Sequence, residues 1–263
     1  MRLVNKLRQS LLSWLAASSV TEKLVLLAPV ALWFSYFPTI SFGRQSGTNL
    51  ELSIAVIYAV VLALVGLPQI WNHRQFLWQQ KAVWLLAMFV GWNLLSVIWS
   101  VNPLRSILVS GLWSVLFLDF LVIYSLPSLK RMVSPLMSIT VTTAVAMSLL
   151  AIVQVVYGAW FDWGLCNGCV ARGFGFVRPS GFAIEPQFFG SLLIAPILLV
   201  SYRLLRDKAT KYDIIALCLM FVALYLTLSR GALYAVTAAV LVQVVLVHWR
   251  TSTNWLRSAT MVI

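Results

Sequence analysis

Charged residues are scarce in this sequence. Only 10% of the 263 residues are Asp, Glu, Lys or Arg, while 61% are hydrophobic. A soluble domain carries about 25% charged residues. So few polar side chains cannot cover the surface of a globule of this size. The composition therefore excludes a soluble domain and predicts that much of the surface faces lipid.

Residues that hold metals or nucleotides are also few. The chain has seven acidic residues, two histidines and three cysteines, and it contains no D-x-D sequence, no paired carboxylates and no Walker motif. A structural zinc site needs four ligands, whereas Cys166 and Cys169 form a single C-x2-C pair. We therefore expect no metal and no cofactor. In an oxidising compartment the two cysteines are candidates for a local disulfide.

Long runs without charge are the main positive feature. A helix that crosses a bilayer needs roughly 20 apolar residues, and most of the uncharged runs fit one crossing each. The predicted fold is all-α: a polytopic transmembrane helix bundle over residues 23–250 with about eight spans. The expected spans are 24–42, 52–71, 82–100, 106–127, 135–157, 186–203, 213–229 and 231–249.

The basic residues give the orientation. With the N-terminus in the cytoplasm, all but five of the 19 Lys and Arg residues fall in cytoplasmic segments, as the positive-inside rule requires. The orientation of the chain in the membrane then accounts for most of the formal charge of +12. Because it is spread over short loops, we expect lipid headgroups as partners and no nucleic acid. The five outer arginines are Arg44, Arg105, Arg172, Arg178 and Arg230.

The two ends of the chain have patterns of their own. Leu3, Leu7 and Leu11 recur at helical spacing among basic residues, which predicts an interfacial cytoplasmic helix over residues 1–22. Residues 251–257 have the character of a cytoplasmic loop, and the apolar residues 258–263 have that of the start of a further, truncated span. These patterns suggest a portion of a longer protein.

The first polar cluster is F-V-R-P-S-G-F-A-I-E-P-Q-F-F-G, residues 176–190. It closes a long outer loop, residues 158–185, and loops of this length are usually functional. Pro186 suits the first turn of a helix, with Glu185 placed to cap it. Arg178 before a helix N-terminus can bind an anion. An Arg178–Glu185 ion pair that fixes the loop is the structural alternative.

The second polar cluster is T-L-S-R-G-A-L-Y-A, residues 227–235. Arg230 stands alone between two apolar helices, where an ionisable residue usually faces protein or water. Gly231 suggests a tight turn. Alternatively, Arg230 extends to the outer headgroups. Both clusters fall on the outer side, and outward arginines there suggest an anionic ligand such as a diphosphate or an acidic sugar.

Asp119 lies within the fourth expected span, in L-F-L-D-F-L. An acid at membrane depth suggests a function such as proton relay. Without a basic partner in the membrane, a hydrogen-bonded structural role is the alternative. The sequence leaves this choice open.

The two clusters resemble motifs of the O-antigen ligase and O-antigen polymerase superfamily. The matching residues are the R-x-x-G and following E-P (Arg178, Gly181, Glu185, Pro186), the S-R-G (Ser229, Arg230, Gly231) and the S-V-N-P-L-R-S segment of residues 100–106. The resemblance implies a metal-independent, inverting glycosyl transfer on the periplasmic face of the bacterial inner membrane, in lipopolysaccharide or polysaccharide biosynthesis. The donor would be a glycan on undecaprenyl diphosphate and the acceptor a sugar hydroxyl.

By the same resemblance, Arg178 and Arg230 would be the catalytic residues that hold the diphosphate. Gly181, Glu185, Ser229, Gly231 and Arg172 would contribute to substrate binding. Ligases of this family also carry a large outer loop with a histidine, which this sequence lacks. Two alternatives stay open: a non-catalytic transporter or binding protein for lipid-linked glycans, and an inactive truncated paralogue.

Overall fold

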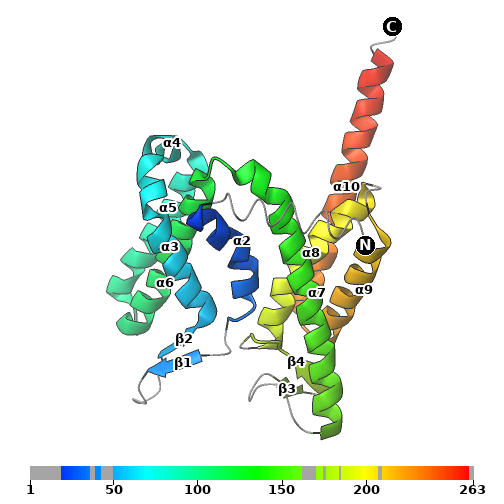
Figure 1. The fold of residues 1–263 in the computed structure, drawn as a ribbon, viewed down its shortest axis with the longest axis horizontal. Coiled ribbons are helices and arrows are strands. Elements are labelled where there is room, and N and C mark those ends of the chain that lie inside the picture. The colour runs from blue at the N-terminus through cyan, green and yellow to red at the C-terminus, as the bar shows by residue number, and fades with distance from the viewer. Residues whose placement is uncertain are drawn as a thin grey trace. The chain divides into compact units, whose positions relative to one another are not determined.

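The computed structural model describes residues 19–35, 39–42, 50–161, 170–173, 176–183, 185–206 and 209–260, and it is mostly helical (Figure 1). The chain divides into two compact units. Unit 1 comprises residues 1–31 and 41–136, and unit 2 comprises residues 32–40 and 137–263. Each unit is described by itself below.

Six helical segments in the described part of the chain are long and apolar enough to cross a membrane. They are Ile54–Asn72 (α3), Lys81–Trp99 (α5, Lys81–Ser96, with the 3-10 turn η1, Val97–Trp99), Pro103–Ser125 (α6), Leu129–Gly158 in α7 (Leu129–Phe161), Pro186–Leu205 (α8) and Arg230–Trp249 in α10 (Arg230–Thr260). A polytopic α-helical membrane protein is thus confirmed.

The expected number of eight spans is not confirmed. The first expected span is occupied by a helix of only 13 residues, α2 (Val20–Leu32), and strand β1 (Thr39–Phe42) follows. The seventh is occupied by a helix of 16 residues, α9 (Lys211–Leu226), because the chain turns at Thr227–Ser229 before the uncharged run ends. Both helices are shorter than the range of about 17–25 residues that a crossing needs.

The end of the chain also differs from the expected loop at residues 251–257. Helix α10 continues without a break to Thr260. No proline or glycine follows Gly231 in this helix, so no residue type in it favours an end before Thr260. Residues 1–18, which hold most of the expected interfacial helix, and residues 261–263 lie outside the described residues.

Unit 1 is built around a close contact between α3 and α6. A β-carbon placed on Gly66 of α3 would overlap the methyl carbons of Val122 on α6, so only glycine permits this approach. Small residues serve the same purpose in membrane helix pairs generally. Helix α5 joins α6 through a hydrogen bond from the Ser110 hydroxyl to the Asn93 carbonyl, 3.0 Å long. The short helix α4 (Arg74–Trp78) leads into α5.

Exposed tryptophan pairs mark the two ends of α5. Trp78 and Trp84 lie with ring centroids 5.0 Å apart near its start, and Trp92 and Trp99 lie 6.0 Å apart toward its end. All four are exposed. Tryptophan is enriched where a helix leaves the hydrocarbon for the headgroups. The two pairs therefore agree with a membrane crossing by α5.

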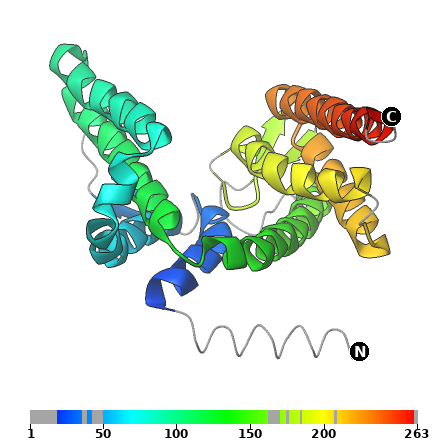
Figure 2. The same ribbon diagram turned by 90° about the horizontal axis from the view of Figure 1, so that it is seen from above.

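Unit 2 packs around α8. Phe189, Leu193, Ile197 and Val200 follow one another at helical spacing on α8 and are completely buried. Helices α9 and α10 both pack against α8, and the α7 segment from Met137 belongs to the same unit (Figure 2). The segment between α7 and α8 contains an antiparallel hairpin of β3 (Val170–Gly173) and β4 (Phe176–Pro179). Strand β4 contacts α8 and α9.

Candidate functional site

A hydrogen bond joins the two polar clusters. The Nε of Arg178, on strand β4, donates to the backbone carbonyl of Thr227, 2.9 Å away, in the turn between α9 and α10. Arg178 is half-buried, and Thr227 is completely buried. The two motifs lie 49 residues apart in sequence and meet at this contact. Arg178 is thus held at Thr227, which precedes Arg230 by three residues in the second cluster.

A second contact fixes the segment after Arg178. The buried side chain of Gln154 on α7 accepts from the Gly181 amide at 3.0 Å and donates to the Gly181 carbonyl at 2.9 Å. Gly181 has a φ of +61°, and a β-carbon there would lie 2.8 Å from the Phe189 ring. Backbone conformation and packing thus both require glycine at this position of the R-x-x-G motif.

The turn between α9 and α10 is tight, and Thr227 and Ser229 in it are buried whereas Leu228 is exposed. Leu228 has a φ of +52°, a backbone conformation that residues other than glycine and asparagine seldom adopt. The Thr227 hydroxyl donates to the Leu224 carbonyl at 2.6 Å and accepts from the Ser229 amide at 3.2 Å. These bonds hold the backbone that Arg178 contacts.

Arg230 is the first residue of α10 and is exposed. Ser229, the residue before it, is buried, and its hydroxyl accepts from the Ala232 amide at 3.4 Å. The expectation that Gly231 supplies the turn is wrong. The positive φ belongs to Leu228, Gly231 lies within the helix, and a β-carbon on Gly231 would meet nothing within 4 Å.

Glu185 occupies the N-cap position of α8, before Pro186, as expected. Its side chain makes no capping hydrogen bond and instead accepts from the Gln187 amide. No Arg178–Glu185 ion pair forms in the described residues, since Arg178 contacts Thr227. The Glu185 side chain is exposed and does not fix the loop through Arg178.

The N-terminal ends of α8 and α10 meet at this cluster. A β-carbon on Gly190, in the second turn of α8, would lie 3.2 Å from Ser229 and 3.3 Å from Ala232. Farther along both helices, the Gln243 amide donates to the Leu198 carbonyl at 3.1 Å. The order of these contacts shows that α8 and α10 run parallel. Their positive dipole ends therefore lie together, beside Arg178 and Arg230, which is a favourable setting for an anion.

The remaining candidate residues are Arg172, the two cysteines and Asp119. Arg172 lies on β3 opposite Val177, next to the Ala171–Arg178 pair in the hairpin register. Cys166 and Cys169 lie outside the described residues. Asp119 belongs to α6 in unit 1. It is 9% exposed, and one of its carboxylate oxygens, Oδ1, has no hydrogen-bond partner in the structure.

Gln154 and Thr227 are the site residues that the sequence did not reveal. Neither is charged; Thr227 begins the second polar cluster but received no role there, and Gln154 lies in neither cluster. Gln154 does interrupt a long apolar run on α7, and a buried amide in a membrane helix needs a partner. This polar interruption was the available signal, although it does not identify Gly181 as the partner.

Comparisons of the chain with models of known protein families, with curated proteins and with solved structures found no match.

Proposed function

We propose that the chain is, or is part of, a metal-independent inverting glycosyltransferase of the O-antigen ligase and polymerase type. It would transfer a glycan from undecaprenyl diphosphate to a sugar hydroxyl on the periplasmic face of the inner membrane. The observation that supports this proposal is the hydrogen bond between Arg178 and Thr227, because it joins the two arginine motifs of the resemblance.

In the proposed reaction the acceptor hydroxyl oxygen attacks the anomeric carbon of the donor sugar from the face opposite the diphosphate. The new C–O bond forms as the bond from that carbon to the phosphate oxygen breaks. Undecaprenyl diphosphate leaves with the electron pair, and the hydroxyl proton passes to a base. Negative charge therefore grows on the leaving phosphate, where cationic donors stabilise the transition state most.

The residues of the site fit these requirements. The exposed Arg230 can bind the diphosphate, with the amides at the start of α10 and α8 close by. Arg178 is oriented by its bond to Thr227 and adds a second cation. The exposed carboxylate of Glu185 stands at the start of α8 and is the group of this cluster that can accept the hydroxyl proton.

The test is a transfer assay with the full chain in proteoliposomes. The substrates are an undecaprenyl-diphosphate-linked oligosaccharide and a free oligosaccharide acceptor. Mass spectrometry measures the lengthened product and the released undecaprenyl diphosphate, and NMR reports the anomeric configuration. We expect a product of inverted configuration. Arg230→Ala and Arg178→Ala should each lower the rate at least about tenfold, as losing a hydrogen bond to a charged group costs about 1.5–3 kcal/mol.

Arg44→Ala is the matched control, because Arg44 is also expected on the outer side but belongs to neither motif. It should leave the rate unchanged. Equal losses of rate in all three variants would show that Arg178 and Arg230 contribute only general surface charge. Movement of the glycan across the bilayer without a covalent product would contradict the transferase proposal and indicate a transporter. Tight donor binding without transfer or movement would leave a binding protein or an inactive paralogue.

A further inference from the structure

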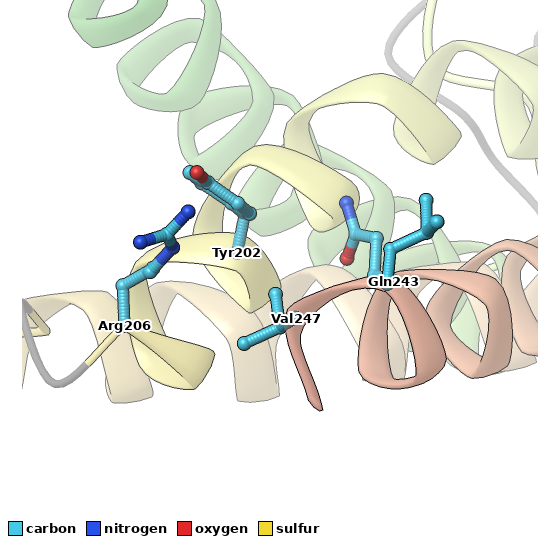
Figure 3. A pocket seen from close by; sticks show the side chains of 5 residues that line it. Tyr202, Arg206, Gln243 and Val247 are labelled. Atoms are coloured by element: carbon cyan, nitrogen blue, oxygen red, sulfur yellow. The ribbon is translucent and has the colours of Figure 1, made fainter. Parts of the chain in front are cut away.

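A second site lies toward the other end of α8. A hollow of about 170 Å³ opens between the last turns of α8 and the middle of α10 (Figure 3). Tyr202 and Arg206 line it from α8, and Gln243, Leu246 and Val247 line it from α10. Tyr202 follows Pro186 by 16 residues, which is about 24 Å along a helix. The hollow is thus separate from the arginine cluster.

Its surroundings are those of a membrane boundary. Leu246 is 54% exposed, and Val242, Val245 and Trp249 on α10 are exposed as well, so this side of the helix faces lipid. Basic residues gather at the same end of α8, namely Arg203, Arg206 and Lys211. Aromatic and basic side chains together mark the headgroup region. The hollow therefore lies at the boundary between the hydrocarbon region and the headgroup region of the bilayer.

Arg206 provides a positive charge at the hollow. Its guanidinium carbon lies 5.4 Å from the centre of the Tyr202 ring, which holds it beside the opening (Figure 3). The nearby carboxylate of Asp213 is occupied, because it accepts from Arg203 at 3.0 Å and from Thr210. Arg206 therefore has no carboxylate partner within the described residues, and a guanidinium binds phosphate with two parallel hydrogen bonds.

The apolar wall suits an acyl chain. Leu246 and Val247 offer only aliphatic surface, and Gln243 is held in place by its bond to the Leu198 carbonyl. The amide oxygen of the same side chain, Gln243 Oε1, is buried and has no hydrogen-bond partner among the described residues. A ligand here needs a phosphate at one end and methylene groups at the other. The surrounding bilayer supplies molecules of that kind.

We propose that this hollow binds an anionic glycerophospholipid, with its phosphate on Arg206 and the first methylenes of an acyl chain against Leu246 and Val247. Basic recesses between membrane helices bind acidic headgroups in this way in other proteins. The site is independent of the proposed glycosyl transfer, since it uses none of the same residues.

The test is native mass spectrometry of the full chain, purified in detergent and titrated with phosphatidylglycerol or phosphatidylcholine. Arg206→Gln removes the charge, and Val247→Trp fills the hollow while keeping every charge. We expect Arg206→Gln to bind phosphatidylglycerol at least about fivefold more weakly, the factor that one basic residue near an anionic surface contributes. Val247→Trp should also bind it more weakly, because the indole ring occupies the hollow. Phosphatidylcholine should bind wild type and Arg206→Gln equally weakly.

Arg74→Gln is the matched control. Arg74 also stands over an aromatic ring, 4.8 Å from the centre of Trp71, but lines no part of this hollow. It should bind phosphatidylglycerol like wild type. Equal weakening by Arg74→Gln and Arg206→Gln would overturn the proposal in favour of diffuse attraction to charge. It would also be overturned if Val247→Trp bound normally, or if inorganic phosphate displaced the lipid completely at equal concentration.

Discussion

Gln154 and Gly181 share two hydrogen bonds: the side-chain nitrogen of Gln154 donates to the Gly181 carbonyl, and its side-chain oxygen accepts from the Gly181 amide. Both residues are completely or almost completely buried. The contact anchors the segment between Arg178 and α8 to helix α7. The position of Arg178 thus depends on a residue 24 positions earlier that carries no charge.

Gln154→Leu should destabilise unit 2 by about 2–4 kcal/mol, because it leaves both the amide and the carbonyl of Gly181 buried without a partner. Thermal unfolding in detergent measures the loss. Gln69→Leu is the control, since the Gln69 amide also donates to a backbone carbonyl, that of Ser125, but in unit 1 and with only partial burial. An unchanged melting temperature in Gln154→Leu would contradict the anchoring role.

Gly190→Leu should disrupt the contact between the N-terminal ends of α8 and α10. Even a β-carbon at this position would lie 3.2–3.3 Å from Thr227, Ser229 and Ala232, so a larger side chain must push the helices apart. Overpacking of this kind costs about 1–3 kcal/mol. The expected result is a lower melting temperature together with weaker binding of the diphosphate donor.

Gly111→Leu is the control for that substitution, because a β-carbon on Gly111 of α6 meets nothing within 4 Å. It should leave the melting temperature within a few degrees of wild type, or raise it, since glycine is a poor helix former. If Gly190→Leu behaved like Gly111→Leu, the two helix ends would not be in contact in the membrane.

Asp119→Leu distinguishes a structural from a functional role for the buried acid of α6. One carboxylate oxygen has no hydrogen-bond partner in the described part of the chain, so an apolar residue of the same branched shape should be neutral or stabilising in thermal unfolding. Asp119→Asn keeps the polarity and serves as the comparison. A loss of activity in the stable Leu variant would assign Asp119 a function, whereas a fall in stability in both variants would make it a structural residue.

The stability of unit 2 should depend on the ionisation of Asp213. Burial alone would raise the pKa of this carboxyl, but the hydrogen bonds from Thr210 and the charge and hydrogen bond of Arg203 outweigh burial and lower the pKa below its ordinary value of 3.8. The folded protein therefore favours the ionised form. The resulting stability is complete above pH 3.8 and is lost as the pH falls through the lower folded pKa.

Thermal unfolding between pH 3 and pH 7 tests this dependence. Asp213→Asn should be less stable than wild type at pH 7 and should converge with wild type at the acidic end, because protonation removes the same interactions. Parallel curves at every pH would show that the ion pair with Arg203 contributes nothing. Glu22→Gln at the start of α2 is a suitable comparison, because the half-buried Glu22 carboxylate accepts a hydrogen bond from the Ser19 amide but belongs to unit 1.

The sequence predicted those features that depend on local pattern. Uncharged runs placed the six long helices, and Glu185-Pro186 correctly marked the start of α8. The turn before Arg230 was also expected, but Gly231 was assigned the role that Leu228 has. Glycine is the usual residue at positive φ, so a leucine in that conformation leaves no signal in the sequence.

The remaining features depend on contacts between distant residues. Thr227 and Gln154 became visible only once the hairpin, α7 and the turn after α9 were in place. Gly181 accepts and donates through its backbone, and Thr227 accepts through its own carbonyl, and these backbone groups are chemically the same at every residue. No spacing rule could have paired Arg178 with Thr227, although both lie within clusters that the sequence had singled out.

The close approach of Gly66 and Val122 has a consequence for the order in which the protein is made. Helices α4 and α5 lie between these two residues in the chain, so α3 is synthesised before its partner α6. At about 5–20 residues per second, the 56 residues from Gly66 to Val122 take about 3–11 seconds to synthesise. During that interval α6 cannot cover the face of α3 at Gly66, so the contact with Val122 forms only after most of α6 has been made.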